Sequence, residues 1–346
     1  MADPTQRILS QDDSLPPVEP PNAAFLVQLF LVPGVIVAII VCVWLAFHWL
    51  AHLGSDPQAY VRTLRRDNEG RWQAALNLAN DLRGPGGAAL KADERLATEL
   101  GRILSDEVTS GRSGEQSQTL RLYLCRALGE FAIPAAAGPL VARAGNLADP
   151  QTARAAVEAL AVLTTNLVAA GRLGDDPAAV TTAVVAASRS DDAPLRSAAA
   201  FTLGVVGGPA ALERLGELSN DSSDDVRYNA ALALARQGRP DSLDTLAEML
   251  ALPDTAMPAD AATGGNGDPA SQSRRYKRAL VVVNALRGVA MVVDATHEPP
   301  PRALLDRIQS LRQDAVADVR SSSAELLKKI ERLSSRAGEE NSDEPK

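Results

Sequence analysis

The chain has few of the residues from which most active sites and disulfide frameworks are built. Among 346 residues there are only three histidines and two cysteines. Cys42 and Cys125 form no CxxC pattern, so the sequence excludes a disulfide framework and a cysteine-based zinc site. It also has no GxSxG, GxxxxGK[ST], GxGxxG or HExxH motif, which excludes the common signatures of serine hydrolases, phosphate-binding loops and zinc peptidases.

Aromatic residues and excess positive charge are scarce as well. Aromatics make up 3% of the chain, and runs of Val, Ile and Thr at a period of two are rare, whereas alanine is abundant. Small side chains and a strong helix former predict an all-α protein with closely packed helices. The formal net charge of −8 makes sequence-independent nucleic-acid binding improbable, because that affinity depends on Lys and Arg. The one dense basic cluster, RRYKR at 274–278, fits contact with anionic headgroups or an acidic partner, or simply a solvated helix start.

One long apolar run predicts a membrane anchor. Residues 29–47 contain no polar side chain, and at about 1.5 Å per residue they match the hydrocarbon thickness of a bilayer. We therefore expect a single transmembrane helix over 24–50, preceded by a disordered, proline-rich tail over 1–23. Arg62, Arg65, Arg66 and Arg71 follow the span and only Arg7 precedes it, which predicts an external N-terminus and a cytoplasmic C-terminal domain, most simply at a bacterial-type inner membrane.

The remainder is repetitive. VRYNAALALA at 226–235 and GRWQAALNLA at 70–79 both place an arginine seven residues before a leucine. Further copies begin near Arg121, Arg196 and Arg320, and weaker ones lie at 153–162 and 278–287. The leucines that end the copies are Leu78, Leu128, Leu160, Leu203, Leu234, Leu286 and Leu327. Second helices are expected between the copies, over 92–108, 132–144, 177–188, 208–219, 241–251 and 301–313.

These copies resemble HEAT repeats, in particular the short HEAT-like repeats of phycobilisome lyases. SDDAPLRSAAAFTLGVVGG (190–208) and SSDDVRYNAALALARQG (222–238) carry the resemblance most clearly. It implies an α-solenoid of about six or seven repeats over 57–335. The composition of the chain predicts a flexible insertion at 252–275 and a disordered acidic tail at 336–346. It also implies that Arg196 and Arg227 bond to aspartates of the turns, such as Asp192, Asp224 or Asp225.

Small residues in the copies predict close packing of successive helices. Ala198, Ala199, Ala230 and Ala231 allow neighbouring helices to approach at the short end of the usual range of about 8–10 Å. No single layer of this kind buries its own apolar face, so each layer needs the next one.

Few residues are candidates for chemistry. His48 and His52 share a helix face at the end of the span, where polar residues at the headgroup layer are a simpler interpretation than a metal or haem pair. His297 and Glu298 are one His-Glu pair, whereas HEAT-repeat deoxyhypusine hydroxylases use several to hold iron, so a loop dipeptide is the better interpretation. Cys125 lies within a repeat and is expected to be a packed thiol. We therefore predict no catalytic, cofactor-binding or metal-binding residues and no cofactor.

Together these features predict a non-enzymatic scaffold at the cytoplasmic face of a membrane, binding protein partners along the solenoid. The alternative, implied by the lyase resemblance, is a HEAT-repeat enzyme or accessory subunit that binds a tetrapyrrole or another cofactor. No nucleic-acid or small-molecule ligand is indicated.

Overall fold

A computed structural model of the protein describes residues 23–52, 57–66, 68, 70–172, 177–253 and 269–340. The chain divides into two compact units, Met1–Asp56 and Pro57–Lys346. Within the described residues every regular element is an α-helix or a short 3₁₀ turn, as the composition predicts. The tail predicted over 1–23, apart from Ala23, lies outside the described residues, as do positions 254–268 of the predicted insertion and 341–346 of the acidic tail.

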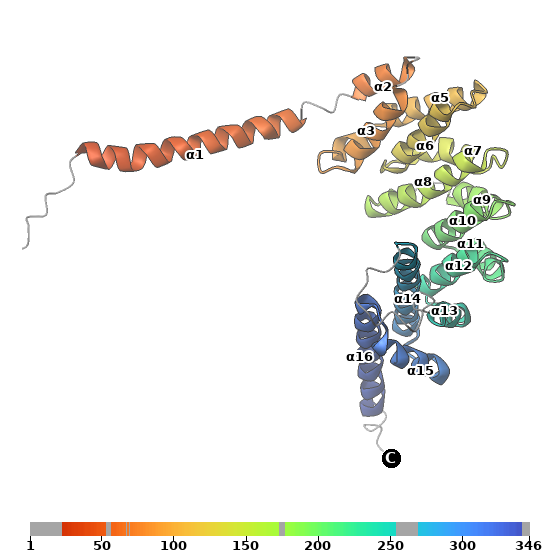
Figure 1. Ribbon diagram of the computed structural model, residues 1–346. Helices are drawn as coiled ribbons and strands as arrows, with labels where there is room; N and C mark the ends of the chain where they lie inside the picture. Colours follow the sequence, from red (N-terminus) through yellow and green to blue (C-terminus); the bar gives the residue numbers. More distant parts are fainter. Residues whose placement is uncertain are drawn as a thin grey trace, which may run out of the picture. The chain divides into compact units, whose positions relative to one another are not determined.

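In the first unit, a single helix carries the apolar run. Helix α1 spans Ala23–His52 and contains Pro33 (Figure 1). Its segment Leu29–Phe47 is long and apolar enough to cross a membrane, with a mean hydropathy of 2.9. A second helix segment, Ser271–Thr296, passes the same test of length and composition but is half buried in the protein. A core helix or a signal sequence also passes this test, so length and composition alone do not establish a span.

The second unit consists of helices throughout. Its helices are α2 (Pro57–Arg65), α3 (Arg71–Arg83), α4 (Ala88–Lys91), α5 (Glu94–Thr109), α6 (Glu115–Gly129), α7 (Ala137–Ala144), α8 (Pro150–Ala169), α9 (Pro177–Ala187), α10 (Ala193–Val206), α11 (Pro209–Leu218), α12 (Asp224–Arg236), α13 (Leu243–Leu250), α14 (Pro269–Thr296), α15 (Arg302–Ser310) and α16 (Ala317–Glu340). Short 3₁₀ turns precede α7 and α13 and follow α15.

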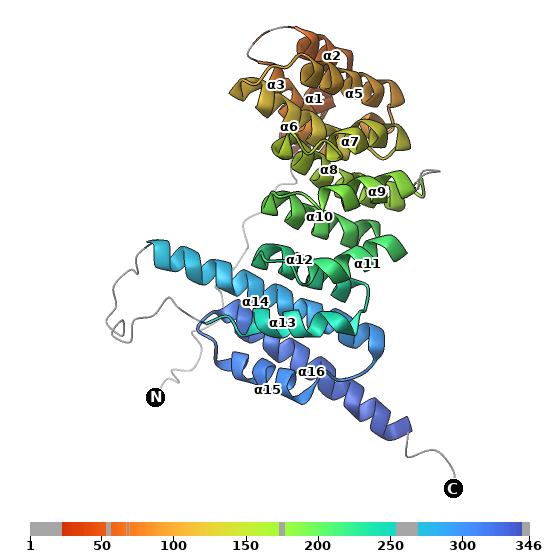
Figure 2. The same ribbon diagram turned by 90° about the vertical axis from the view of Figure 1, so that its right-hand side faces the viewer.

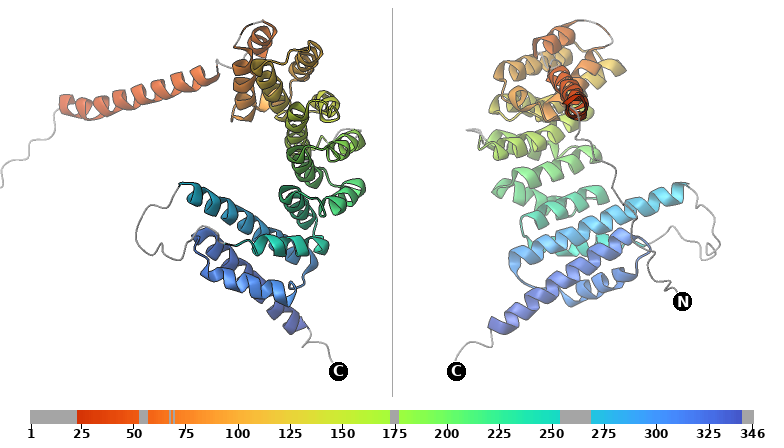
Figure 3. Two further views of the ribbon diagram at one scale, coloured as in Figure 1. Left: turned by 45° about the vertical axis from the view of Figure 1, so that its right-hand side comes forward. Right: turned by 90° about the vertical axis from the view of Figure 1, so that its left-hand side faces the viewer.

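These helices form two layers (Figures 2 and 3). The Arg-bearing layer contains α3, α6, α8, α10, α12, α14 and α16, and each of these helices packs against the next. The second layer contains α5, α7, α9, α11, α13 and α15, each within a few residues of its predicted range. The arrangement is an α-solenoid, as predicted. Helix α14 begins at Pro269, so residues 269–275, which we had placed in the insertion, are helical.

Local sequence explains where the helices start. Asp93, Asp149 and Asp192 each cap a helix by accepting a hydrogen bond from the backbone N–H three residues later. Two of these caps are followed by proline in the first turn, where the missing N–H has no intrahelical partner. Asp-Pro and Asp-x-Pro therefore mark the first turns of α8 and α10.

The predicted leucines form the core, and the closest helix contacts involve glycine. All seven repeat leucines are buried. A Cβ atom added at Gly129 would lie 2.8 Å from the carbonyl oxygen of Ala159, and one added at Gly204 would lie 2.5 Å from the Cβ of Ala233. Since carbon atoms in van der Waals contact lie about 3.5–4.0 Å apart, only glycine fits at these two crossings. The helices of successive repeats therefore approach closely at these two glycines.

Candidate functional site

Three arginines of the Arg-bearing layer, Arg121, Arg196 and Arg278, connect their repeat to the next. Arg121 Nη1 lies 2.6 Å from Asp149 Oδ2, and Arg278 Nη2 lies 2.8 Å from Asp314 Oδ2. Arg196 binds both carboxylate oxygens of Asp221, at 2.8 and 2.9 Å. In each pair the carboxylate lies just before the next Arg-bearing helix in the chain, so the contact joins neighbouring repeats.

These ion pairs shift the acid–base properties of the turns. The hydrogen bonds from Arg196 hold the pKa of Asp221 below its usual value, against the opposing effect of burial. Burial raises the pKa of Asp314, but hydrogen bonds from Arg278 and from the Val316 N–H outweigh it, and the net pKa is lowered. The turns therefore favour ionised carboxylates.

The partners differ in part from those implied by the family resemblance. Arg196 does not pair with Asp192, which caps α10, but with Asp221 of the next repeat. Arg227 does pair with Asp224, at 2.9 Å, and also with Glu248 of α13, at 2.6 Å. The prediction of Asp192 as a partner of Arg196 was wrong. The Asp192 carboxylate instead accepts a hydrogen bond from the Leu195 N–H and caps the start of its own helix, α10.

Helix α8 departs from this pattern, and its departure shapes the surface. Its arginine is shifted by one residue, so buried Ala153 occupies the position where neighbouring helices carry the coupling arginine. Arg154 is exposed instead and lies 3.6 Å from Glu158, one turn along the same helix. Both side chains of this pair are exposed and line two hollows on the surface of the Arg-bearing layer.

The two hollows form a groove across four helices. One hollow, of about 490 Å³, is lined by residues of α6 and α8, including Tyr123 and Val162. The other, of about 400 Å³, is lined by residues of α8, α10 and α12, including Phe201. Arg154 and Glu158 line both hollows. We call the surface of these two adjoining hollows, over α6, α8, α10 and α12, the groove.

Apolar side chains in the groove are accessible. Val162 is 39% exposed and Phe201 is 44% exposed. The guanidinium of Arg236 lies 5.7 Å from the centre of the Phe201 ring, and Tyr123 stacks on Trp72 of α3 with ring centres 6.1 Å apart. Aromatic rings held in place by neighbours lose little side-chain entropy on binding, a property typical of residues that contribute much of the energy at interfaces.

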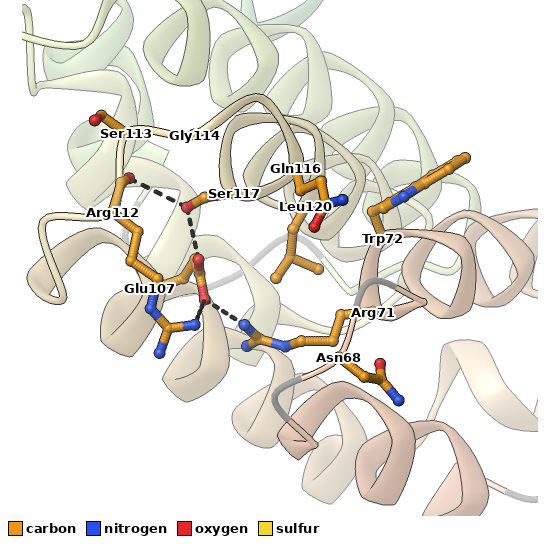
Figure 4. A pocket seen from close by; sticks show the side chains of 10 residues that line it. All are labelled: Asn68, Arg71, Trp72, Glu107, Arg112, Ser113, Gly114, Gln116, Ser117 and Leu120. Carbon is orange, nitrogen blue, oxygen red and sulfur yellow. Dashed lines mark hydrogen bonds and ion pairs between the residues drawn. The ribbon is translucent and has the colours of Figure 1, made fainter.

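A third hollow, of about 520 Å³, lies at the start of the second unit (Figure 4). Its centre is Glu107, which is 3% exposed. The Glu107 carboxylate accepts hydrogen bonds from Arg71, at 2.8 Å, and from the Ser117 hydroxyl, at 2.6 Å, and Arg112 lies 3.8 Å away. Arg71 of α3 therefore pairs with Glu107 of α5, within its own repeat and not with the next one. The network satisfies a buried acid and fixes the first layers, which is a structural role.

The other sequence candidates lie apart from these hollows. Cys125 is fully buried, and burial raises its pKa to about 12, which fits a packed thiol. His297 ends α14 with a left-handed backbone conformation (φ 56°) and is exposed beside Glu298. The side chains of His48 and His52 are outside the described part of the chain. Among the described residues, no three His, Cys, Asp or Glu side chains are grouped so that they could hold a metal ion.

Two features of the layers were not visible in the sequence. The Asn166 side-chain amide donates to the carbonyl groups of Gly129 and Glu130, and the Gln237 amide donates to that of Gly204. Each amide therefore caps the end of the preceding Arg-bearing helix. The groove was also missed, because it depends on which exposed positions of four separate helices line up.

Comparisons with known proteins agree with this architecture. A family model of HEAT repeats matches residues 180–263, which confirms the resemblance for that segment. A comparison with curated proteins finds no significant match.

Among solved structures, human deoxyhypusine hydroxylase in complex with glycerol is 19% identical, with 82% of this chain and 98% of that chain covered and a TM-score of 0.31. A designed armadillo repeat protein in complex with the peptide (KR)4 is 14% identical, with 80% and 100% covered and a TM-score of 0.36. A second designed armadillo repeat protein is 14% identical, with 79% and 99% covered and a TM-score of 0.35.

Proposed function

We propose that this protein is a membrane-anchored scaffold that holds a protein partner in the groove of its solenoid, without catalysing a reaction. Helix α1 is the anchor, and the solenoid lies on the cytoplasmic side, as the arginines after the span suggest. The observation that carries the proposal is the groove itself, a hollowed surface across α6, α8, α10 and α12 that is lined by exposed Val162 and Phe201 and by half-buried Tyr123.

The dimensions of the groove suit an extended segment of a partner. Four helices spaced by about 8–10 Å cover roughly 24–30 Å, which an extended chain spans with about eight residues. The apolar side chains offer anchors, while Arg154, Glu158 and Asp225 offer polar contacts at the rim. Anchoring in a membrane raises the local concentration of a partner in the same membrane, so that a small contact area is sufficient.

Site-specific photocrosslinking tests this proposal. A photoreactive amino acid at position 162 of the full-length chain, in native membranes, should give a discrete adduct with a protein partner. The same amino acid at exposed Glu213 of α11, in the second layer, is the matched control and should not give this adduct.

The adduct should depend on the groove and not merely on proximity. Phe201→Asp, which places a charge at the apolar anchor on the neighbouring helix α10, should reduce the adduct at position 162 by at least tenfold, about 1.4 kcal/mol of binding free energy. An adduct of equal yield from positions 162 and 213, or one that is insensitive to Phe201→Asp, would contradict the proposal.

A further inference from the structure

The strongest concentration of positive charge on this acidic protein lies on α14. Between Pro269 and Val293 the helix has five basic residues and no acidic one, although the chain as a whole carries a net charge of −8. Four of the five fall within 274–278.

Only part of this charge is used inside the protein. The side chain of Arg278 is only 10% exposed and pairs with Asp314 of the turn before α16, and it donates to the carbonyl oxygen of Leu252. Arg274 and Lys277, by contrast, are exposed. They lie on the first turns of α14, which precede the buried part of the helix that begins at Ala279 (Figures 2 and 3).

Large apolar side chains accompany these cations. Tyr276 is 66% exposed and Leu280 is 46% exposed. Since residues four apart are neighbours on a helix, these two side chains form one apolar strip, with Lys277 next to it. We call Arg274, Tyr276, Lys277 and Leu280 the α14 patch.

We propose that the α14 patch is a peripheral membrane-contact site for anionic lipid headgroups, which holds the solenoid against the bilayer surface. Exposed Arg and Lys next to Tyr and an aliphatic side chain is the composition that binds the headgroup region, where the cations meet phosphates and the apolar groups enter the acyl boundary.

Lipid suits the patch better than a protein because the same chain carries a candidate span, which brings the solenoid close to a membrane. The inference rests on the anchoring part of the proposed function and is independent of the groove. Two cations contribute about 1 kcal/mol each near an anionic surface. Replacing Arg274 and Lys277 by acidic residues should therefore lower the ratio of membrane-docked to undocked solenoid by at least roughly thirtyfold.

The test uses the full-length chain in lipid nanodiscs. Cys42→Ala removes the exposed native thiol, and Tyr276→Cys carries an environment-sensitive dye. In discs of phosphatidylcholine and phosphatidylglycerol at low salt, the dye emission should shift to the blue and the dye should be protected from an aqueous quencher. Neither effect should occur in discs of phosphatidylcholine alone, or at high salt, since salt screens exposed charges.

Matched variants separate a specific patch from overall charge. The double variant Arg274→Glu/Lys277→Glu should abolish the blue shift. Lys328→Glu/Arg332→Glu makes the same change of net charge at exposed positions of α16 and should retain it. A dye at Glu213→Cys should report no lipid dependence.

The outcomes distinguish this inference from the proposed function. A chain that fails to enter the nanodiscs contradicts the anchor and with it the inference. A chain that enters them but shows no lipid-dependent shift at position 276, or equal loss in both charge-reversal variants, overturns the patch alone. A shift that requires an added acidic protein would assign the patch to a protein partner and also overturn the inference.

Discussion

Replacing Gly204 by alanine tests the packing of the layers at one atom. The new Cβ would lie 2.5 Å from the Cβ of Ala233 and 3.0 Å from its Cα, so α10 and α12 must separate by about 1 Å to restore normal carbon contacts. Overpacking of this kind costs about 1–3 kcal/mol. Alanine also favours the helical state over glycine by about 1 kcal/mol, which reduces the net loss.

Gly216→Ala is the matched control for this substitution. Gly216 also lies within a helix, α11, but a Cβ added there meets no atom within 4 Å. The helix-propensity gain is therefore common to both variants, and the difference between them isolates the overpacking cost of about 1–3 kcal/mol.

Hydrogen exchange on the full-length chain is the suitable assay, because layered repeat proteins open locally and need not unfold in a single step. Gly204→Ala should raise exchange in α10 and α12, whereas Gly216→Ala should leave it unchanged or lower it. Equal exchange for the two variants would refute the close approach of α10 and α12 described above.

Three further predictions follow from the contacts between layers. Asp221→Asn should destabilise the solenoid by about 2 kcal/mol at neutral pH, since it removes charge-assisted hydrogen bonds. Because the pKa of Asp221 is lowered in the folded state, this contribution is present above its unfolded pKa of about 3.9 and is lost as the pH falls through the folded pKa. The free energies of unfolding of the wild-type chain and Asp221→Asn, measured by chemical denaturation, should therefore become equal at acidic pH and remain different at basic pH. Asn166→Ala should leave the carbonyl groups of Gly129 and Glu130 without their cap and cost about 1 kcal/mol, measured as faster exchange at the end of α6. Cys125, buried and with a raised pKa, should resist alkylation at pH 8 until denaturant is added, and rapid reaction in the native protein would contradict its burial.

Helix positions were predictable because short-range patterns encode them. Apolar periodicity and the Asp, Gly or Pro residues that precede many of these helices located the second helices to within a few residues, and the seven repeat leucines are all buried. The weak copy at 278 retains its function, since Arg278 pairs with Asp314 like its better-conforming counterparts. Adherence to a consensus was therefore a poor measure of whether the contact between layers is kept.

Contacts across layers were less predictable because they depend on how the helices stack. Asp192 and Asp221 are both aspartates next to a repeat, yet the first caps its own helix and the second binds Arg196 from the preceding layer. The groove depends in the same way on α8, where the one-residue shift that made its copy look degenerate places Arg154 on the surface. The one-residue shift was visible in the sequence. That it places Arg154 in a groove could not be predicted, because the groove is also lined by the neighbouring helices α6, α10 and α12.

Thiol accessibility in native membranes tests the central claim, a membrane-held solenoid with an occupied groove, most directly. Val162→Cys and Glu213→Cys are each introduced with Cys42→Ala, and Cys125 is expected to stay unreactive because it is buried. Reaction with a bulky maleimide should be slow at position 162 in native membranes and fast in the purified chain, whereas position 213 should react equally in both. Equally fast reaction at position 162 in native membranes and in the purified chain would show that nothing occupies the groove and would contradict the account.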